Sequence, residues 1–257
     1  MGLLSDFVDK IPIDSGDTIL FSSDVTRIGL WFHKNHEHLD LNAFLDLLVE
    51  KVGSDGTILF PTYNWDFCGG KTFDYKNTLS KTGTISQAAL QHSGFRRTQH
   101  PIYSWAVSGK DKDFLCSLEN TDSFGQDSPF NYLYEKHGKN IILDVSMQNS
   151  FTFVHYVEEC VGVSYRYIKN FTADYIDENG HKNNRTYSMY VRAYDLDAEV
   201  SLAPMEQYLI ENGIASVVSV GLSRILSVPF VSAFDAIRDD ILHNKARKIA
   251  TYKGQNG

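Results

Sequence analysis

The alternation of short apolar runs with segments of helical periodicity is the feature that most constrains the fold of this chain. Residues 18–21 and 57–60 are largely apolar runs typical of buried strands, and Pro61 ends the second. Between them, apolar side chains from 41 to 49 recur at helical spacing, and Gly53 follows as a stop signal. The same reasoning predicts further strands at 103–107, 139–145, 214–220 and 224–228, and further helices at 85–90, 151–160, 204–212 and 234–242. This alternation indicates an α/β fold.

An antiparallel element is predicted in the C-terminal part. Alternating segments at 165–168, 173–176 and 186–191 flank Asn179-Gly180, and Asn-Gly between two such runs is a hairpin signal. We therefore expect a single compact α/β domain spanning residues 1–257, with a mixed sheet flanked by helices and an antiparallel hairpin near its C-terminal end. The order of the strands in the sheet does not follow from the sequence.

The composition argues against several classes of protein. No apolar run approaches the roughly 20 residues needed to cross a bilayer, and the N-terminus lacks the basic start and apolar core of a secretory signal. The three cysteines are far apart and odd in number, which argues against a disulfide framework and a zinc ribbon. We expect a cytoplasmic protein with reduced thiols, no membrane association and no metal. The net charge of −8 disfavours nucleic acid as a partner; it either favours a cationic substrate or only aids solubility.

One stretch carries a hydroxyl, an imidazole and a carboxylate at helical spacing. If it is helical, Thr152, His155 and either Glu158 or Glu159 share one face. The carboxylate can orient the imidazole, which can take a proton from an amine near neutral pH, and the hydroxyl can help to stabilise a developing oxyanion. From spacing alone, a partly buried histidine with an ordinary acidic neighbour is the simpler interpretation. A zinc-binding helix would need a second histidine at the i+4 position, which is absent.

Two other segments could bind anions. A predicted strand ends in the hydroxyl-rich turn from Ser22 to Gly29, and such turns present backbone N–H groups to anions. The pair Arg96-Arg97 precedes another predicted strand and could meet phosphates, although a solvated basic loop is the simpler explanation. Neither segment carries a standard nucleotide-binding fingerprint. The pair Ser128-Pro129 is explained as the cap and first residue of a helix.

Taken in their order along the chain, these segments resemble the aminoglycoside 3-N-acetyltransferase family, antibiotic acetyltransferases that use acetyl-coenzyme A. The resemblance runs from Gly16 to Glu159 and continues more loosely to Val228. The residues that carry it are Ser22-Ser23 with Gly29, the run from Gly53 to Pro61, Thr82-Gly83, the run from Arg97 to Pro101 with Ser104 and Gly109, Phe124-Gly125 with Ser128-Pro129, and Thr152, His155 and Glu158.

The resemblance implies a compact α/β architecture of the antibiotic N-acetyltransferase type. It also implies direct transfer of an acetyl group from the thioester to a substrate amine, without a covalent acyl-enzyme. On that pattern His155 is the general base, acting directly or through water, Glu158 orients it, and Thr152 lies near the thioester carbonyl. The coenzyme A channel would be lined by two segments, with Ser22, Ser23, Arg27 and Gly29 from the first and Arg97, His100 and Ser104 from the second.

Several features depart from drug-modifying members of the family. Phe21 stands where members usually carry histidine, Asp144 stands where a glycine is often found, and the segments 64–81 and 165–169 do not match. In these features the chain is more similar to relatives that act in surface-polysaccharide or sugar biosynthesis. They favour a biosynthetic amino sugar, free or nucleotide-linked, as the acceptor, with the 165–169 stretch stacking on and pairing with a nucleotide. An aminoglycoside, with antibiotic resistance as the outcome, is the alternative.

Two further interpretations stay open. The chain could be a binding protein that keeps the fold without catalysis, although the joint presence of Thr152, His155 and Glu158 argues against it. A different acyl group is also compatible with the sequence. The oligomeric state, a homodimer included, does not follow from the sequence.

Overall fold

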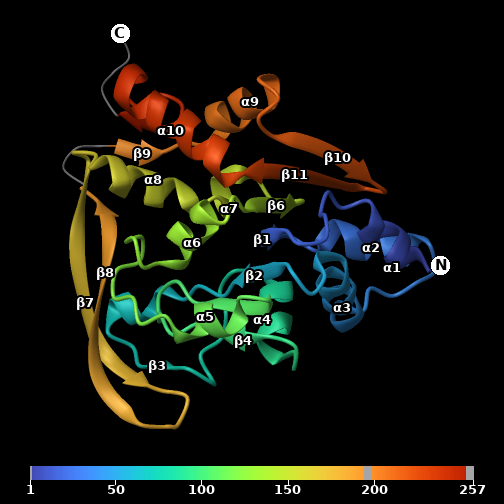
Figure 1. The fold of residues 1–257 in the computed structure, drawn as a ribbon, viewed down its shortest axis with the longest axis horizontal. Helices are drawn as coiled ribbons and strands as arrows, with labels where there is room; N and C mark the ends of the chain where they lie inside the picture. Colours follow the sequence, from blue (N-terminus) through green and yellow to red (C-terminus); the bar gives the residue numbers. More distant parts are fainter. Residues whose placement is uncertain (1, 194–197, 253–257) are drawn as a thin grey trace.

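The computed structural model describes residues 2–193 and 198–252, and a seven-stranded mixed sheet lies at its centre (Figure 1). The strand order is β10-β11-β6-β1-β2-β5-β4. The three central strands β1, β2 and β6 are parallel, and the strands outside them run antiparallel to their neighbours. Their bounds are Thr18–Ser23 (β1), Thr57–Pro61 (β2), Arg96–Arg97 (β4), Trp105–Gly109 (β5), Lys139–Leu143 (β6), Ser216–Val220 (β10) and Ser223–Pro229 (β11). The predicted mixed sheet is confirmed.

Helices cover both faces of this sheet because its inner strands are apolar on both sides. Ile19 and Phe21 of β1 pack into one core, and Leu20 between them packs into the other. The first core is closed by α1 (Leu3–Asp9), α2 (Thr26–Lys34), α3 (Leu41–Val52) and α4 (Thr84–Gln91). The second is closed by α5 (Lys112–Ser117), α6 (Pro129–Glu135), α8 (Phe153–Val161), α9 (Ala203–Glu211) and α10 (Phe230–Asn244). Continuous apolar strands buried on both faces are the expected sequence pattern for this layered arrangement.

A long two-stranded ribbon forms a second layer of structure. Strands β7 (Arg166–Ile176) and β8 (Lys182–Arg192) have eleven residues each and pair along their whole length, so the hairpin predicted around Asn179-Gly180 is confirmed. The ribbon runs along one side of the molecule, from α8 at one end to β3 (Phe73–Asp74) at the other, where β3 pairs with β7 (Figure 1). A further small sheet joins β9 (Ala198–Val200) to β12 (Ala250–Tyr252).

Two predicted segments differ in detail. The helix expected from residue 151 begins at Phe153, because a short separate helix, α7 (Met147–Ser150), precedes it and Phe151 breaks the continuity with a ψ of 60°. The segment 64–81, for which no helix or strand was predicted, contains the 3-10 helix η1 (Trp65–Gly69) as well as β3. The N-cap of α6 is as predicted: the Ser128 hydroxyl accepts a hydrogen bond from the Asn131 N–H, and Pro129 is the first helical residue.

The residue after β6 explains one departure from the family pattern. Asp144 has a φ of +54°, in the left-handed region where glycine is favoured. Its buried carboxylate accepts a hydrogen bond from the Arg224 N–H at 2.8 Å. Aspartate tolerates this backbone conformation better than most residues, and here the bond to the neighbouring strand β11 holds its side chain, so aspartate can stand in the position of glycine.

The state of the cysteines and the character of the helices were also predicted from the sequence. Cys68, Cys116 and Cys160 are unpaired thiols. Within residues 2–193 and 198–252, no helix combines the length and the apolar character needed to span a membrane.

The tight contact between β2 and β5 yields a stability prediction. Gly109 has a φ of +106°, and a Cβ there would lie 2.3 Å from the Gly56 carbonyl oxygen. Gly109→Ala should lower the free energy of unfolding by about 2–4 kcal/mol, as expected for backbone strain with a clash. Gly29→Ala is the matched control, because Gly29 lies inside α2 with no atom within 4 Å of an added Cβ. It should raise stability by up to about 1 kcal/mol. Urea denaturation measures both, and equal midpoints for the two variants would contradict the prediction.

Candidate active site

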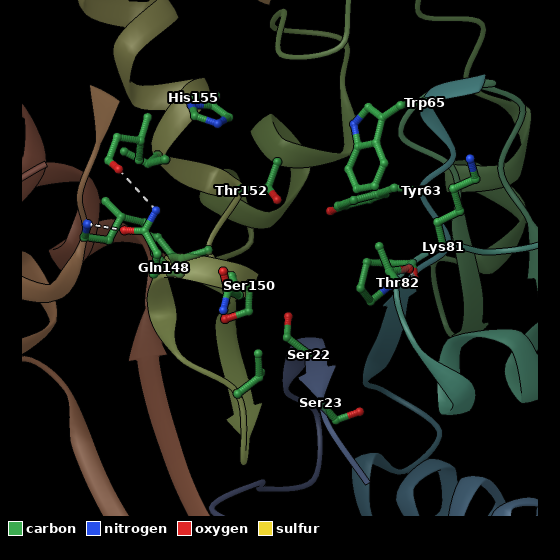
Figure 2. Close-up of a pocket in the computed structure, with 17 residues that line it drawn as sticks. Ser22, Ser23, Tyr63, Trp65, Lys81, Thr82, Gln148, Ser150, Thr152 and His155 are labelled. Carbon is green, nitrogen blue, oxygen red and sulfur yellow. Dashed lines mark hydrogen bonds between the residues drawn. The ribbon is translucent and has the colours of Figure 1, made fainter. Parts of the chain in front are cut away.

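A cleft of about 330 Å³ opens where the parallel strands β1 and β2 end (Figure 2). In open α/β sheets, the carboxyl ends of the strands are the usual place for ligands. Ser22 and Ser23 at the end of β1 form its base, and α7 with the start of α8 forms one wall. The segments that follow β2 and precede α4 form the opposite wall. The lining residues of the two walls are Val145, Gln148 to Thr152, Val154, His155, Val200 and Leu202 on one, and Pro61, Tyr63, Trp65, Lys81 and Thr82 on the other.

A buried carboxylate orients the imidazole that faces this cleft. The Nδ1 atom of His155 lies 2.7 Å from Oε2 of Glu158, one helical turn further along α8. The Glu158 side chain is completely buried, whereas the His155 side chain is 21% exposed and lines the cleft. Because Nδ1 faces the carboxylate, Nε2 is the ring nitrogen left to act on a ligand.

A buried arginine side chain completes this arrangement. The Nε atom of Arg166, the first residue of β7, lies 2.6 Å from the same Oε2 of Glu158. Its side chain is also buried. One oxygen of one carboxylate is therefore shared by an imidazole from α8 and a guanidinium from the ribbon. The sequence suggested that Arg166 pairs with a nucleotide, but its burial against Glu158 excludes that contact.

Burial and charge together set the protonation states. Burial lowers the pKa of His155 below its usual value and the Arg166 charge lowers it further, while Glu158 acts in the opposite direction. Burial alone would raise the pKa of Glu158, but the contacts with His155 and the charge of Arg166 outweigh it, and the pKa falls below its usual value. At neutral pH the carboxylate is therefore ionised and the imidazole is neutral, which is the form that accepts a proton.

The choice between the two neighbouring acids is resolved by the helix phase. Glu158 contacts His155, whereas Glu159 faces Asp122. Burial and the nearby Asp122 raise the pKa of Glu159 to about 8. Glu159 thus has no part in orienting the imidazole.

Two hydroxyl groups meet near the middle of the cleft. Thr152 is the N-cap residue of α8, but its side chain makes no capping bond. Instead, it faces the side chain of Tyr63 across the cleft (Figure 2). Burial raises the pKa of Tyr63 well above its usual value, so this phenol stays protonated and can donate. The pair provides O–H donors beside His155.

The base of the cleft offers polar groups from the end of β1 and the start of α4. The Ser22 hydroxyl donates to Oδ1 of Asn140, at 3.1 Å. Oγ of Ser23 is buried, with no hydrogen-bond partner in the part of the chain that the structure describes. Gly83 precedes α4, whose first N–H groups have no side-chain cap, and a Cβ on Gly83 would lie 3.4 Å from the Ser23 carbonyl oxygen. Uncapped N–H groups at a helix start suit an anion.

The rest of the predicted turn from Ser22 to Gly29 lies differently. The N–H of Thr26 at the start of α2 is already bonded to Oδ1 of Asp24, at 2.9 Å. Gly29 lies within α2 rather than in a turn. The Arg27 side chain is 61% exposed, approaches Asp144 at 3.9 Å and does not line the cleft. Of this segment, the cleft thus contains Ser22 and Ser23.

The second predicted segment lies behind the cleft wall. Arg97, His100 and Ser104 are buried and do not line the cleft. Arg97 donates to Oγ of Ser104 at 3.0 Å and to the Thr78 carbonyl at 2.5 Å, so it fastens the segment 64–81 to the sheet. Burial lowers the pKa of His100 to about 3, and its neutral ring accepts the Tyr103 N–H at 3.1 Å. These side chains were expected to contact coenzyme A. In the structure they are bonded to other groups of the protein and support the cleft wall from behind.

Sequence reasoning did not single out four lining residues, Tyr63, Trp65, Lys81 and Gln148. Trp65 and Lys81 could have been suspected because they lie in the segment 64–81, which departs from the family pattern. Gln148 lies on α7, where its amide accepts the Leu202 N–H at 2.6 Å and donates to the Val200 carbonyl at 3.2 Å. It joins the cleft wall to the segment after β9.

An imidazole oriented by a buried carboxylate over a cleft has the geometry with which a site can take a proton from a bound nucleophile. The model of the family described as aminoglycoside 3-N-acetyltransferase matches residues 20–241, so the chain belongs to that family. The chain is accordingly an acyltransferase, and the class and the acetyl-coenzyme A donor predicted from the sequence are confirmed at the level of the family. No curated protein sequence matches the chain.

Solved structures share the fold at low sequence identity. A binary complex of AAC-IIIb with CoASH is 18% identical, with a TM-score of 0.75 over 91% of this chain and 92% of that one. The YokD protein from Bacillus subtilis is 19% identical, with a TM-score of 0.75 over 95% and 93%. AAC-VIa with bound sisomicin is 18% identical, with a TM-score of 0.75 over 94% and 97%. The predicted fold class is therefore confirmed.

The shared carboxylate yields a prediction on the titration of His155. Arg166→Met removes a positive charge beside the imidazole, so the pKa of His155 should rise. The readout is an NMR titration of histidine-labelled protein, with the His155 signal assigned by its loss in His155→Gln. Arg27→Met removes an exposed arginine and is the control that should leave the midpoint unchanged. An unchanged midpoint in Arg166→Met would show that the guanidinium does not act on the imidazole.

Proposed function

We propose that this protein transfers the acetyl group of acetyl-coenzyme A directly to the amine of a biosynthetic amino sugar, free or nucleotide-linked, with His155 as the general base. The observation that carries the proposal is the His155–Glu158 pair, in which a buried carboxylate holds a neutral imidazole at the cleft. The identity of the reacting amine and the role of His155 both rest on this geometry and on membership of the family.

Each polar group of the cleft has a role in this scheme. Nε2 of His155 takes the proton that the amine loses, directly or through a water molecule, and Glu158 keeps the ring in position. The hydroxyl of Thr152, which faces Tyr63, donates a hydrogen bond to the acyl oxygen. Acetyl-coenzyme A supplies an activated acyl carbon: its bond to nitrogen forms as the carbon–sulfur bond breaks, and the proton from nitrogen finally neutralises the thiolate. Ser22, Ser23 and the uncapped start of α4 would hold the coenzyme.

The charge of the cleft supports an amino sugar over an aminoglycoside. Although the chain carries a net charge of −8, none of the described residues that line the cleft is aspartate or glutamate. Lys81 adds a positive charge there. A polycation gains affinity from an acidic cleft, which these walls do not provide. The alternative, an aminoglycoside 3-N-acetyltransferase that confers resistance, is favoured by the family and by relatives whose structures hold sisomicin or apramycin.

A binding protein without catalysis is the further alternative. In such a protein the buried carboxylate would need Arg166 as its partner, but it would not need an imidazole held at the cleft as well. The retained geometry of His155, Glu158 and Arg166 therefore supports an enzyme.

The general base can be tested by removal. His155→Ala should lower kcat by roughly 10²–10⁴-fold, the usual contribution of a positioned base. Coenzyme A binding, measured by calorimetry, should persist because the base of the cleft is intact. His181→Ala, in the exposed turn of the ribbon, is the control and should retain full activity. Turnover of His155→Ala within a few-fold of wild type would refute the assignment.

The acceptor can be tested by competition between two panels. Wild-type protein is given acetyl-coenzyme A with amino sugars, free and nucleotide-linked, and separately with aminoglycosides, and products are identified by mass spectrometry. We expect kcat/KM for the best amino sugar to exceed that for the best aminoglycoside by roughly tenfold or more, about 1.4 kcal/mol of discrimination. The product mass also reports the size of the transferred acyl group. Drug turnover far above that of every amino sugar would overturn the preference.

A further inference from the structure

We infer that Trp65 is a stacking platform for the pyranose ring of the acceptor, and that the acceptor is a monoamino pyranose bearing an anionic group such as a phosphate. This inference rests on the proposed function and specifies its substrate. It arises from the position of Trp65 on the cleft wall opposite His155, beside Lys81 (Figure 2).

The Trp65 ring is held in position by its neighbours and yet is partly exposed. Its side chain is 42% exposed although it lines the cleft, which is unusual for a large aromatic ring in the absence of a ligand. Edge contacts hold the ring: the centroids of Tyr63 and Tyr103 lie 6.3 and 6.4 Å away, at interplanar angles of 74° and 85°. The indole N–H also approaches the Tyr103 hydroxyl at 3.5 Å.

The backbone beneath Trp65 is fixed as well. The Asn64 side chain accepts the Asp66 N–H at 2.9 Å and donates to the Leu79 carbonyl at 2.9 Å. These bonds join the start of η1 to the segment that leads to Lys81. A ring held in this way loses little conformational freedom when a ligand covers it, so stacking on it contributes more to affinity.

The chemistry of the platform suits a sugar. The face of an aromatic ring is electron-rich and attracts the weakly positive C–H groups that one face of a pyranose presents. A pyranose lying on Trp65 would occupy the space between the indole and His155, and an equatorial amine on it could point towards Nε2. In Figure 2, Thr152 lies at the lower side of this space, and Tyr63 lies below the indole.

The charges around Trp65 favour an acceptor that carries a negative group in addition to its amine. Lys81 contacts Asp66 at 2.6 Å, and Lys71 contacts the other oxygen of the same carboxylate at 3.3 Å. Two cations share one anion, so this edge of the cleft keeps one positive charge in excess. It repels a second ammonium group on the acceptor and attracts a phosphate or carboxylate.

The test measures binding and turnover on Trp65→Leu, Trp65→Phe and Leu79→Ala. Leu79 lies on the same segment, is exposed and does not line the cleft, so Leu79→Ala controls for general disturbance. The probes are the 1-phosphates of 2-amino, 3-amino and 4-amino pyranoses and the corresponding methyl glycosides. For the best sugar phosphate, Trp65→Leu should weaken binding in calorimetry, and raise KM, by roughly tenfold or more, equivalent to about 1.4 kcal/mol. Trp65→Phe should recover most of the loss, and KM for acetyl-coenzyme A should not change.

Lys81→Gln tests the charge. It should raise KM for the sugar phosphate by several-fold and leave KM for the methyl glycoside unchanged. An equal effect on both probes, or unchanged sugar binding in Trp65→Leu, would overturn the inference, as would a rise in KM for acetyl-coenzyme A alone, which would place Trp65 on the donor side. Binding is read without turnover. A protein that binds the sugar phosphate through Trp65 but acetylates nothing would therefore refute the proposed function and not the platform.

Discussion

The carboxylate of Glu158 is the group on which the rest of the site depends. It is completely buried, and it would be unstable there without both of its partners, because an unpaired buried charge costs several kcal/mol. His155 and Arg166 approach the same oxygen, one from α8 and the other from β7. This shared oxygen therefore orients the imidazole, opposes the lowering of its pKa by burial, and joins the ribbon to the helix.

The mixed sheet determines where the cleft lies. The parallel strands β1 and β2 end at the same edge, where the last residues of β1 form the base of the cleft and the segment that leaves β2 forms one wall. The chain then returns through β6 beside β1, and α7 and α8 form the second wall. The cleft is therefore a consequence of topology, and its walls come from segments far apart in the sequence.

Local patterns in the sequence were sufficient for much of the fold. Thr18–Ser23, Thr57–Pro61 and the hairpin around Asn179-Gly180 follow from apolar runs and turn chemistry that act over a few residues. His155 and Glu158 lie one helical turn apart, but it was the resemblance to the family, and not this spacing, that singled them out as base and orienting acid. Arg97 could not be placed in this way, because an arginine is exposed by default and its burial depends on carbonyl groups of Thr62 and Thr78 that only the fold brings to it. Arg166 was predicted to contact a nucleotide and Trp65 was not predicted at all, because the fold alone brings Arg166 to Glu158 and Trp65 to the cleft.

The positions of these groups along the chain have an evolutionary consequence. The base, its carboxylate and the guanidinium all lie between His155 and Arg166, whereas Tyr63, Trp65 and Lys81 lie on a separate segment that Arg97 fastens to the sheet. On the proposed function, proton transfer and stacking of the acceptor sugar thus depend on two stretches of sequence that can mutate separately. A lineage that keeps the first stretch and varies the second can then exchange one acceptor for another without losing its reaction.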